Sequence, residues 1–394
     1  MGSLAERGSP CWQRAPFEGD ATEADATLAA PFRGPHLFAM PIRRATLALA
    51  TLASLATAPL LAQAPGCTPL PPGAQHPGAA FAFNKVREDV IHAVGTGTMA
   101  VGANATIVVN AADLLIVDAG LSPAAFCVLL DELKALTSKP VRTVIVTHFH
   151  FDHAHGSQVL GPEVEIIGSS FTRSQLMSGA SVRGRGYEAF IKTLPAQVAA
   201  AKAQRDTAKD ANRRSALGAR IALLEAEIAA DAAVIPTPPT LTVDDHLTLY
   251  RGGREIQIRY IGRAHTAGDV VVVLPKERVV MTGDMLTFGV PFMGDGFVNE
   301  WPATLEALKA LPFDVVLPGH GPAFPERERI DWAQAYFRDL WPKVVALHDA
   351  KVSAADAARQ IDMRAHSAHF PGITTVGVDV NGVARIFDVL EGKK

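Results

Sequence analysis

The chain has 394 residues, 37 Lys and Arg against 40 Asp and Glu, and a formal net charge of −3. This length suits two or three average domains, although single α/β sandwiches of this size also occur. Because no global basic field is present, we expect no nucleic-acid partner.

The N-terminal region has the features of a secretory signal peptide. A pair of arginines precedes an apolar stretch and an A-x-A cleavage site that ends at Ala64. We therefore predict a signal peptide at 40–64, a periplasmic or secreted protein, and no membrane span after cleavage. Residues 1–39 are then an over-extended, disordered start upstream of a true initiator at Met40. An uncleaved anchor is the alternative.

Residues 65–82 are rich in Pro and Gly and are expected to form an extended linker. Cys67 lies in this linker, whereas Cys127 lies in an amphipathic helix predicted near 124–136. An exported location allows these two cysteines to form a disulfide, but the sequence does not establish one. The other interpretation of Cys127 is a small, buried apolar residue.

Apolar, β-branched runs separated by turn residues predict strands at 90–94, 105–109, 114–117 and 141–146. The last run leads into four ligand-type side chains within six residues, which are His148, His150, Asp152 and His153. Three imidazoles and a carboxylate are expensive to bury together unless a cation holds them. The block therefore predicts a divalent metal site at the end of a strand, with zinc favoured and iron or manganese as alternatives.

Three later strands, at 257–261, 278–281 and 314–317, each end in a further candidate ligand next to a glycine. These candidates are His265, Asp284 and His320. Glycine lets the backbone turn sharply there and brings the side chain toward a metal without a Cβ clash. Five histidines and two aspartates are enough ligands for two metals.

Between the block and His265, residues 183–235 show helical spacing and are rich in Ala, Arg, Lys and Glu, with helices predicted at 197–212 and 214–230. This insertion is either a helical hairpin packed on the fold, or a lid or dimer contact that shapes access to the metals.

A Gly-rich segment with aromatic residues, 288–301, follows Asp284. It is either a pocket wall for an uncharged or partly apolar substrate or ordinary core under a loop. The C-terminal residues 351–394 are expected to form a helix and a short hairpin, without a chemical role.

The motifs His-x-His-x-Asp-His, Gly-x-x-His-Thr, Thr-Gly-Asp and Pro-Gly-His-Gly, in this order, resemble those of the metallo-β-lactamase superfamily. The resemblance spans about residues 90–324. It implies a mixed α/β fold, a four-layer αββα sandwich at 83–350 that carries the helical insertion. It also implies two Zn²⁺ ions, the first held by His148, His150 and His265, the second by Asp152, His153 and His320, with Asp284 as a bridge.

Two residues near these ligands have open roles. Asp118 follows the strand at 114–117, and the resemblance suggests that its carboxylate orients a ligand imidazole. A plain turn role at Asp118 is equally compatible with the sequence. His155 either lines the mouth of the cleft or, as we expect, is exposed to solvent.

Two divalent ions that share a solvent molecule lower its pKa to about 7, so hydroxide becomes available as the nucleophile. Asp152 is the predicted catalytic residue, because it would orient this hydroxide. The expected reaction is hydrolysis of an ester, thioester, lactone or amide carbonyl in a small molecule.

Asp284 as the bridge resembles the glyoxalase II, lactonase and general hydrolase branches, whereas zinc β-lactamases usually carry Cys or Ser there. Export favours β-lactamase activity instead, so a β-lactamase is one alternative. An iron-dependent persulfide dioxygenase or related oxidase is the alternative from another class, although such sites generally bind a single iron through fewer ligands. The sequence leaves the natural substrate and the oligomeric state open.

Overall fold

The computed structural model of this chain describes residues 66–67 and 78–393. The signal peptide expected at 40–64 and the segment 1–39 lie outside the described residues. Strand β1 begins at Phe81, so the linker expected at 65–82 ends earlier than predicted, and much of it also lies outside.

The first sheet has seven strands in the order of the sequence, β1-β2-β3-β4-β5-β6-β7. The pairs from β1 to β4 are antiparallel and those from β4 to β7 are parallel. The strands are β1 (Phe81–Arg87), β2 (Val90–Gly95), β3 (Ala105–Val109), β4 (Leu114–Val117), β5 (Val141–Ile145), β6 (Glu165–Gly168) and β7 (Leu241–Thr242).

The second sheet has five strands in the order β12-β11-β10-β9-β8. Its pairs are antiparallel, except that β11 and β12 are parallel. The strands are β8 (His246–Arg251), β9 (Arg254–Tyr260), β10 (Val270–Leu274), β11 (Val279–Gly283) and β12 (Val315–Pro318). The predicted strands are therefore present, with small shifts at their ends.

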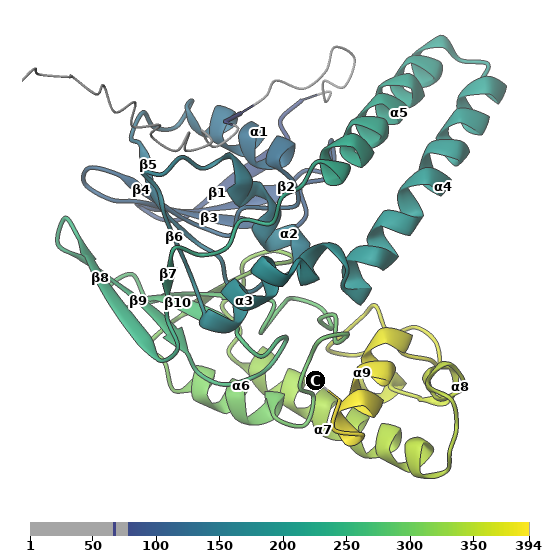
Figure 1. The fold of residues 1–394 in the computed structure, drawn as a ribbon. Helices are drawn as coiled ribbons and strands as arrows, with labels where there is room; N and C mark the ends of the chain where they lie inside the picture. Colours follow the sequence, from purple (N-terminus) through teal and green to yellow (C-terminus); the bar gives the residue numbers. More distant parts are fainter. Residues whose placement is uncertain (1–65, 68–77, 394) are drawn as a thin grey trace, which may run out of the picture. The chain divides into compact units, whose positions relative to one another are not determined.

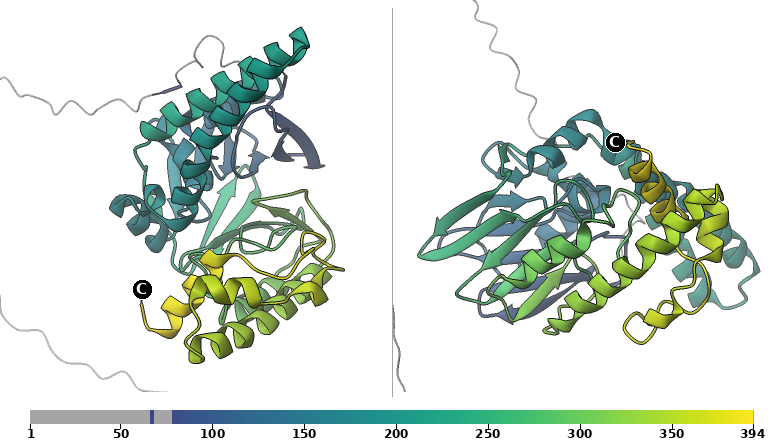
Figure 2. Two further views of the ribbon diagram at one scale, coloured as in Figure 1. Left: turned by 90° about the vertical axis from the view of Figure 1, so that its right-hand side faces the viewer. Right: turned by 90° about the horizontal axis from the view of Figure 1, so that it is seen from below.

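Helices cover the outer faces of both sheets (Figures 1 and 2). The α-helices are α1 (Pro123–Leu133), α2 (Phe151–Ala154), α3 (Ser170–Ser178), α4 (Arg185–Thr207), α5 (Ala211–Ala232), α6 (Trp301–Lys309), α7 (Glu328–Asp349), α8 (Ala354–Gln360) and α9 (Val380–Leu390). Three short 3₁₀ helices are η1 (His155–Val159), η2 (Ala180–Val182) and η3 (Arg364–His366).

Successive residues of a strand point to opposite faces of its sheet and pack in different hydrophobic cores. Three such cores separate the four layers of the fold. On β4, Leu115 and Val117 pack in the core between the two sheets. Their neighbours Leu114 and Ile116 pack on the opposite face, in the core that includes α1. A third core lies between the second sheet and helices α6 and α7. The predicted αββα sandwich is confirmed, because each sheet buries one face against the other sheet and one against helices.

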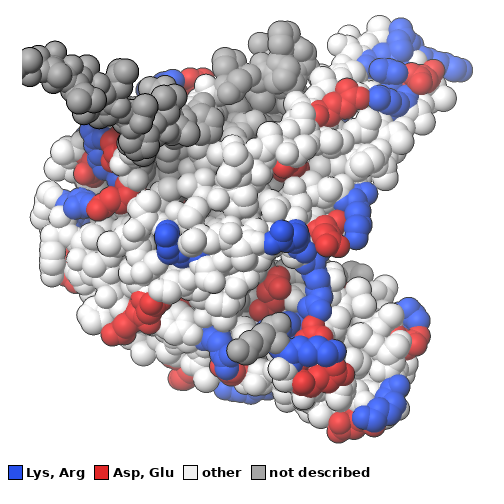
Figure 3. Space-filling model, in the orientation of Figure 1, with Lys and Arg blue, Asp and Glu red and all other residues white. Residues whose placement is uncertain are grey.

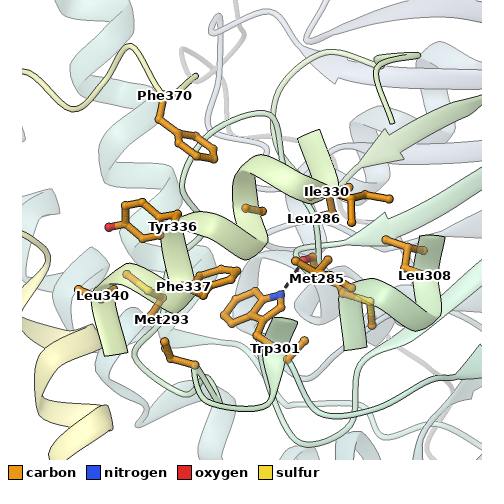
Figure 4. Close-up of a cluster of buried hydrophobic side chains, with 14 of the residues drawn as sticks. Met285, Leu286, Met293, Trp301, Leu308, Ile330, Tyr336, Phe337, Leu340 and Phe370 are labelled. Atoms are coloured by element: carbon orange, nitrogen blue, oxygen red, sulfur yellow. Dashed lines mark hydrogen bonds between the residues drawn. The ribbon is translucent and has the colours of Figure 1, made fainter. Parts of the chain in front are cut away.

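The third core is built around Trp301 of α6, whose indole stacks on Phe337 of α7 with ring centroids 4.5 Å apart (Figure 4). The buried Trp301 Nε1–H donates to the carbonyl oxygen of Met285 at 2.8 Å. Because Met285 directly follows Asp284, this hydrogen bond connects the aromatic core to one of the predicted ligands.

The predicted helical insertion is present as α4 and α5, an antiparallel pair (Figures 1 and 2). The first helix starts at Arg185, well before the predicted residue 197, since it continues through Pro195. The residue before a proline is normally biased away from helix, so local sequence alone favours a later start. A small core of Val198, Ala201 and Ile221 holds the two helices together.

The short hairpin expected near the C-terminus is wrong, because residues Val380–Leu390 form helix α9. Asp379 caps this helix by accepting a hydrogen bond from the backbone N–H of Asn381. Val383 and Ile386 are buried on one face against the helical core. The helical spacing of these apolar residues, rather than a two-residue alternation, decides the conformation.

Cys67 and Cys127 form a disulfide, with Cα atoms 5.4 Å apart. The interpretation of Cys127 as a free apolar residue is therefore wrong. The disulfide ties the segment before β1 to helix α1.

Lys and Arg are interspersed with Asp and Glu on the face shown in Figure 3, and the tip of the α4–α5 pair carries the densest basic group in that view. Across residues 66–67 and 78–393, every helix is too short or too polar to cross a bilayer.

Candidate metal centre

All seven predicted ligands come together at the carboxyl ends of strands from both sheets. His148 and His150 follow β5, and Asp152 and His153 lie on the short helix α2. The other three side chains come from the loops after β9, β11 and β12, and they are His265, Asp284 and His320.

The ligand atoms form three overlapping groups, and the atoms within each group lie within 4.8 Å of one another. The groups are His148, His150 and His265; His148, His153 and Asp284; and Asp152, His153 and His320. His265 Nε2 is 2.8 Å from His150 Nδ1. On the other side, His320 Nε2 is 3.1 Å from Asp152 Oδ2. The arrangement forms two adjacent concentrations of donor atoms rather than one.

Several ring nitrogens of these histidines are buried without a hydrogen-bond partner. Among the described residues, His148 Nε2, His153 Nε2 and His265 Nδ1 are buried and unpartnered. An unpartnered buried polar atom is costly, and a divalent cation would satisfy the nitrogen lone pairs of His148 and His153. The donor set of imidazoles and carboxylates fits zinc.

Asp118 orients two of the imidazoles. Its Oδ2 lies 2.7 Å from His153 Nδ1 and accepts a hydrogen bond from Thr147 Oγ1 at 3.0 Å. Thr147 Oγ1 is also 3.1 Å from His148 Nδ1. This network assigns the Nδ1 protons to the side facing Asp118 and leaves both Nε2 atoms aimed at the centre. The orienting role is therefore correct, and Asp118 also occupies a turn with φ of 65°.

Asp295 orients a third imidazole and was missed by sequence reasoning. Its Oδ2 lies 2.9 Å from His150 Nε2, so His150 Nδ1 is left to face His265. Asp295 belongs to the Gly-Asp-Gly of the segment after Asp284, and that turn sequence was the only signal for it. Nothing local connects it to a histidine 145 residues away.

Glycine at two positions allows the loops to approach closely. A Cβ on Gly319 would clash with Asp284 Oδ1 and would lie 2.6 Å from His153 Cε1. Gly283 has a φ of 51°, and a Cβ there would meet Thr147 Oγ1 at 2.5 Å. The glycines beside the ligands are therefore required by packing as well as by conformation.

The charges of the centre are strongly coupled. Although burial lowers it, the pKa of His320 is raised to about 10 by Asp284 and Asp152. Burial and the neighbouring His150 instead lower the pKa of His265 to about 3. Burial raises the pKa of Asp284, but charge interactions and hydrogen bonds with His320 and His153 outweigh it and hold the pKa well below its ordinary value. The carboxylates are thus held ionised, which is the form that binds a metal.

The expectation that His155 is exposed is wrong. The side chain is fully buried, and its Nε2 lies 3.1 Å from Ser181 Oγ. Its ring packs edge-on against Tyr187 of α4, with ring centroids 5.7 Å apart. The residue follows the ligand block closely, yet η1 turns it under the helical insertion. Burial lowers the pKa of His155 to about 4, so the ring is neutral at physiological pH.

A pocket of about 650 Å³ opens onto the ligands. Its walls are residues 287–292, two residues of α4 (Gly186 and Ala189), and Asp379 and Asn381 at the start of α9. The apolar segment after Asp284 is therefore a pocket wall at 287–292 and ordinary core at Met293, Val298 and Trp301. The helical insertion contributes to the pocket with its first helix.

Comparisons with known proteins place this chain in a family. The family model described as "Metallo-beta-lactamase superfamily" matches residues 99–165 and 186–320. The linear primary-alkylsulfatase of Pseudomonas sp. (strain ATCC 19151) is 26% identical over 253 residues, which are 61% of this chain and 44% of that protein. A type 2 metallo-beta-lactamase of Elizabethkingia meningoseptica is 33% identical over 85 residues, which are 20% of this chain and 34% of that protein.

The chain thus spans less than half the length of these curated relatives. Among solved structures, the metallo-beta-lactamase from Pontibacter korlensis aligns with a TM-score of 0.47 and 17% identity, covering 66% of this chain and 99% of that one.

Proposed function

Since the chain belongs to the metallo-beta-lactamase superfamily, we propose that it is a metal-dependent hydrolase that carries two zinc ions. One observation carries the proposal: three overlapping ligand groups converge next to a pocket. Buried imidazole nitrogens in these groups have no hydrogen-bond partner within the described part of the chain.

The residues divide into two ligand sets that share one carboxylate. We assign His148, His150 and His265 to the first ion and Asp152, His153 and His320 to the second, with Asp284 between them. The short distances within each set support this division. Zinc content, measured on the purified protein, is expected to be close to two ions per chain. One iron per chain would instead favour the persulfide dioxygenase alternative.

Bound divalent ions would supply a water molecule with a pKa of about 7 and polarise the scissile carbonyl. Asp152 lines the pocket, which supports the proposal that its carboxylate orients a water molecule and accepts its proton. Asp118 and Asp295 hold the imidazoles in the tautomer that a cation needs.

The pocket favours an uncharged, partly apolar substrate. Phe288, Val290 and Phe292 line it, and Asp379 lies among the same lining residues. A negative charge at the wall disfavours an anionic substrate beside it. We therefore propose an ester, thioester, lactone or amide carbonyl as the reacting group.

A sulfate ester is the second candidate, because the similarity to the alkylsulfatase covers more of the chain than the similarity to the β-lactamases. A β-lactam is the third candidate substrate class, and the same experiment tests it. A panel of an activated carboxylic ester, a thioester, a lactone, an alkyl sulfate and a chromogenic cephalosporin, each with and without chelator, ranks these classes.

The variant Asp152→Ala is expected to retain the fold and lose turnover of whichever substrate is accepted. Chelator-resistant turnover, or full activity in this variant, would overturn the proposed mechanism.

We also propose that the protein is exported to the periplasm or secreted. The disulfide between Cys67 and Cys127 supports this location, because disulfides persist in oxidising compartments. Expression of the full chain followed by mass spectrometry of the mature N-terminus tests the predicted cleavage after Ala64. A cytoplasmic, uncleaved product would contradict export.

A further inference from the structure

A second cavity, of about 710 Å³, lies on the other side of the pocket wall. Residues 288–292 and Asp379 line both this cavity and the pocket that opens onto the ligands. The opposite wall of the second cavity is the irregular segment between η3 and α9, residues 370–378. The two hollows therefore adjoin along one shared wall.

The second cavity is apolar in character. Tyr336, Met363, Phe370, Ile373 and Val378 contribute to its lining. Figure 4 shows the rings of Phe370 and Tyr336 at one side of the stacked Trp301 and Phe337. The ring centroids of Tyr336 and Phe370 lie 5.7 Å apart in an edge-to-face arrangement.

Large apolar side chains remain exposed around this pair of cavities. Phe288 is 38% exposed and lines both of them. Val376 is 44% exposed beside the second cavity, and Val380 is 43% exposed next to Asp379. Apolar exposure concentrated at the rim of a cavity is typical of a surface that receives an apolar ligand.

Because the two cavities adjoin along this wall, we propose that the second cavity is a subsite for an aliphatic chain carried by the substrate. The inference rests on the proposed hydrolase function, because the reacting group of the same molecule would lie in the ligand-lined pocket. The chain would pass along the wall formed by 288–292 and end against Phe370 and Ile373. Carboxylic esters of fatty acids and alkyl sulfates both carry such a chain, and the experiment below distinguishes these two substrate classes.

Gly372 provides a way to fill the second cavity alone. It lines this cavity but not the ligand-lined pocket. A Cβ built on Gly372 meets no atom within 4 Å, and its φ lies outside the left-handed region. A side chain at this position therefore starts in open space, and we expect the variant Gly372→Trp to keep the fold. Gly218 on α5 has the same free surroundings and lines neither cavity, so Gly218→Trp is the matched control.

The first measurement is kcat/KM for the p-nitrophenyl esters of acetate, butyrate and octanoate, with octyl and ethyl sulfate as the second series. In the native protein each added methylene is expected to raise kcat/KM roughly two- to fourfold in the series that is accepted. Gly372→Trp should lower the ratio of long-chain to short-chain kcat/KM by at least roughly tenfold, while Gly218→Trp should leave this ratio unchanged. A flat series in the native protein, or an unaltered ratio in Gly372→Trp, overturns the subsite.

The second measurement does not need turnover. Calorimetric titration with 1-octanol, which cannot be hydrolysed, is expected to show binding to the native protein and to Gly218→Trp that is at least roughly tenfold tighter than binding to Gly372→Trp. Equal binding to all three proteins, or none, overturns the subsite. If no substrate class of the panel above is turned over but this difference in binding is present, the hydrolase proposal fails and the subsite stands.

Discussion

A buried pair of carboxyl groups on α5 should make the stability of this protein fall as the pH rises. Glu227 is only 6% exposed and Asp231 only 4%, and Glu227 Oε1 and both oxygens of Asp231 have no hydrogen-bond partner among the described residues. Burial first, and then the nearby Asp231, raise the pKa of Glu227 from 4.5 to about 8. Burial raises the pKa of Asp231 to about 7.

The direction of the effect follows from proton binding. Below about pH 4.5, Glu227 is protonated in both the folded and the unfolded chain, so it does not oppose folding. As the pH rises toward 8, the unfolded chain gives up this proton while the folded chain keeps it, and the free energy of unfolding decreases. A pKa raised from 4.5 to about 8 corresponds to a decrease on the order of 4 to 5 kcal/mol.

The variant Glu227→Gln removes this titration and keeps the shape of the side chain. Because Glu227 lines a cavity that reaches solvent, part of the charge is screened, and we expect the variant to be more stable than the native protein by on the order of 3 kcal/mol at about pH 9. At about pH 4 the two should be equally stable. Titration of the metal-site histidines affects both proteins alike and cancels in this comparison.

Urea unfolding at both pH values measures the difference, with the disulfide left intact. Glu225→Gln is the matched control, since Glu225 lies two residues away on the same helix, is half exposed and pairs with Lys202 at 2.7 Å. That exposed pair should contribute at most about 1 kcal/mol. Equal unfolding midpoints for Glu227→Gln and the native protein at about pH 9 would refute the assignment of a neutral, buried carboxyl.

Three further changes test the site and the disulfide. Asp118→Asn removes the charge that holds His153 and should weaken zinc binding by roughly 10- to 100-fold, as read by competition with a chromophoric chelator; unchanged affinity would leave Asp118 only its turn role. Gly319→Ala would place a Cβ 2.6 Å from His153 Cε1 and should reduce the zinc content while far-ultraviolet circular dichroism stays native, so full zinc occupancy would contradict the close approach. Cys67→Ser opens a loop that spans 60 residues to Cys127 and should lower the free energy of unfolding by about 4 kcal/mol; an unaltered urea midpoint would mean that the disulfide does not stabilise the fold.

Local sequence was sufficient to predict most of the strands and helices and to single out the candidate ligands. Each ligand-type residue follows a strand that is recognisable within a window of a few residues, and each has a glycine or a second ligand nearby. Parallel and antiparallel strands that end at one edge bring such residues together, so the convergence of His265 and His320 on the 148–153 block could be predicted. The αββα layering followed from the resemblance, and the alternation of apolar residues on the strands is its physical basis.

Contacts between distant segments were decided only in the folded chain. Asp295 faces His150 across 145 residues, and Cys67 meets Cys127 across 60, because of the path that the chain takes between them. His155 is buried because α4 covers it, although its own neighbourhood resembles a surface turn. The apolar cavity beside the pocket requires the segment before α9 to lie against the loop after Asp284. Short windows of sequence encode backbone conformation and ligand chemistry, whereas burial, charge pairing and cavities arise from the packing of elements that are far apart in the chain.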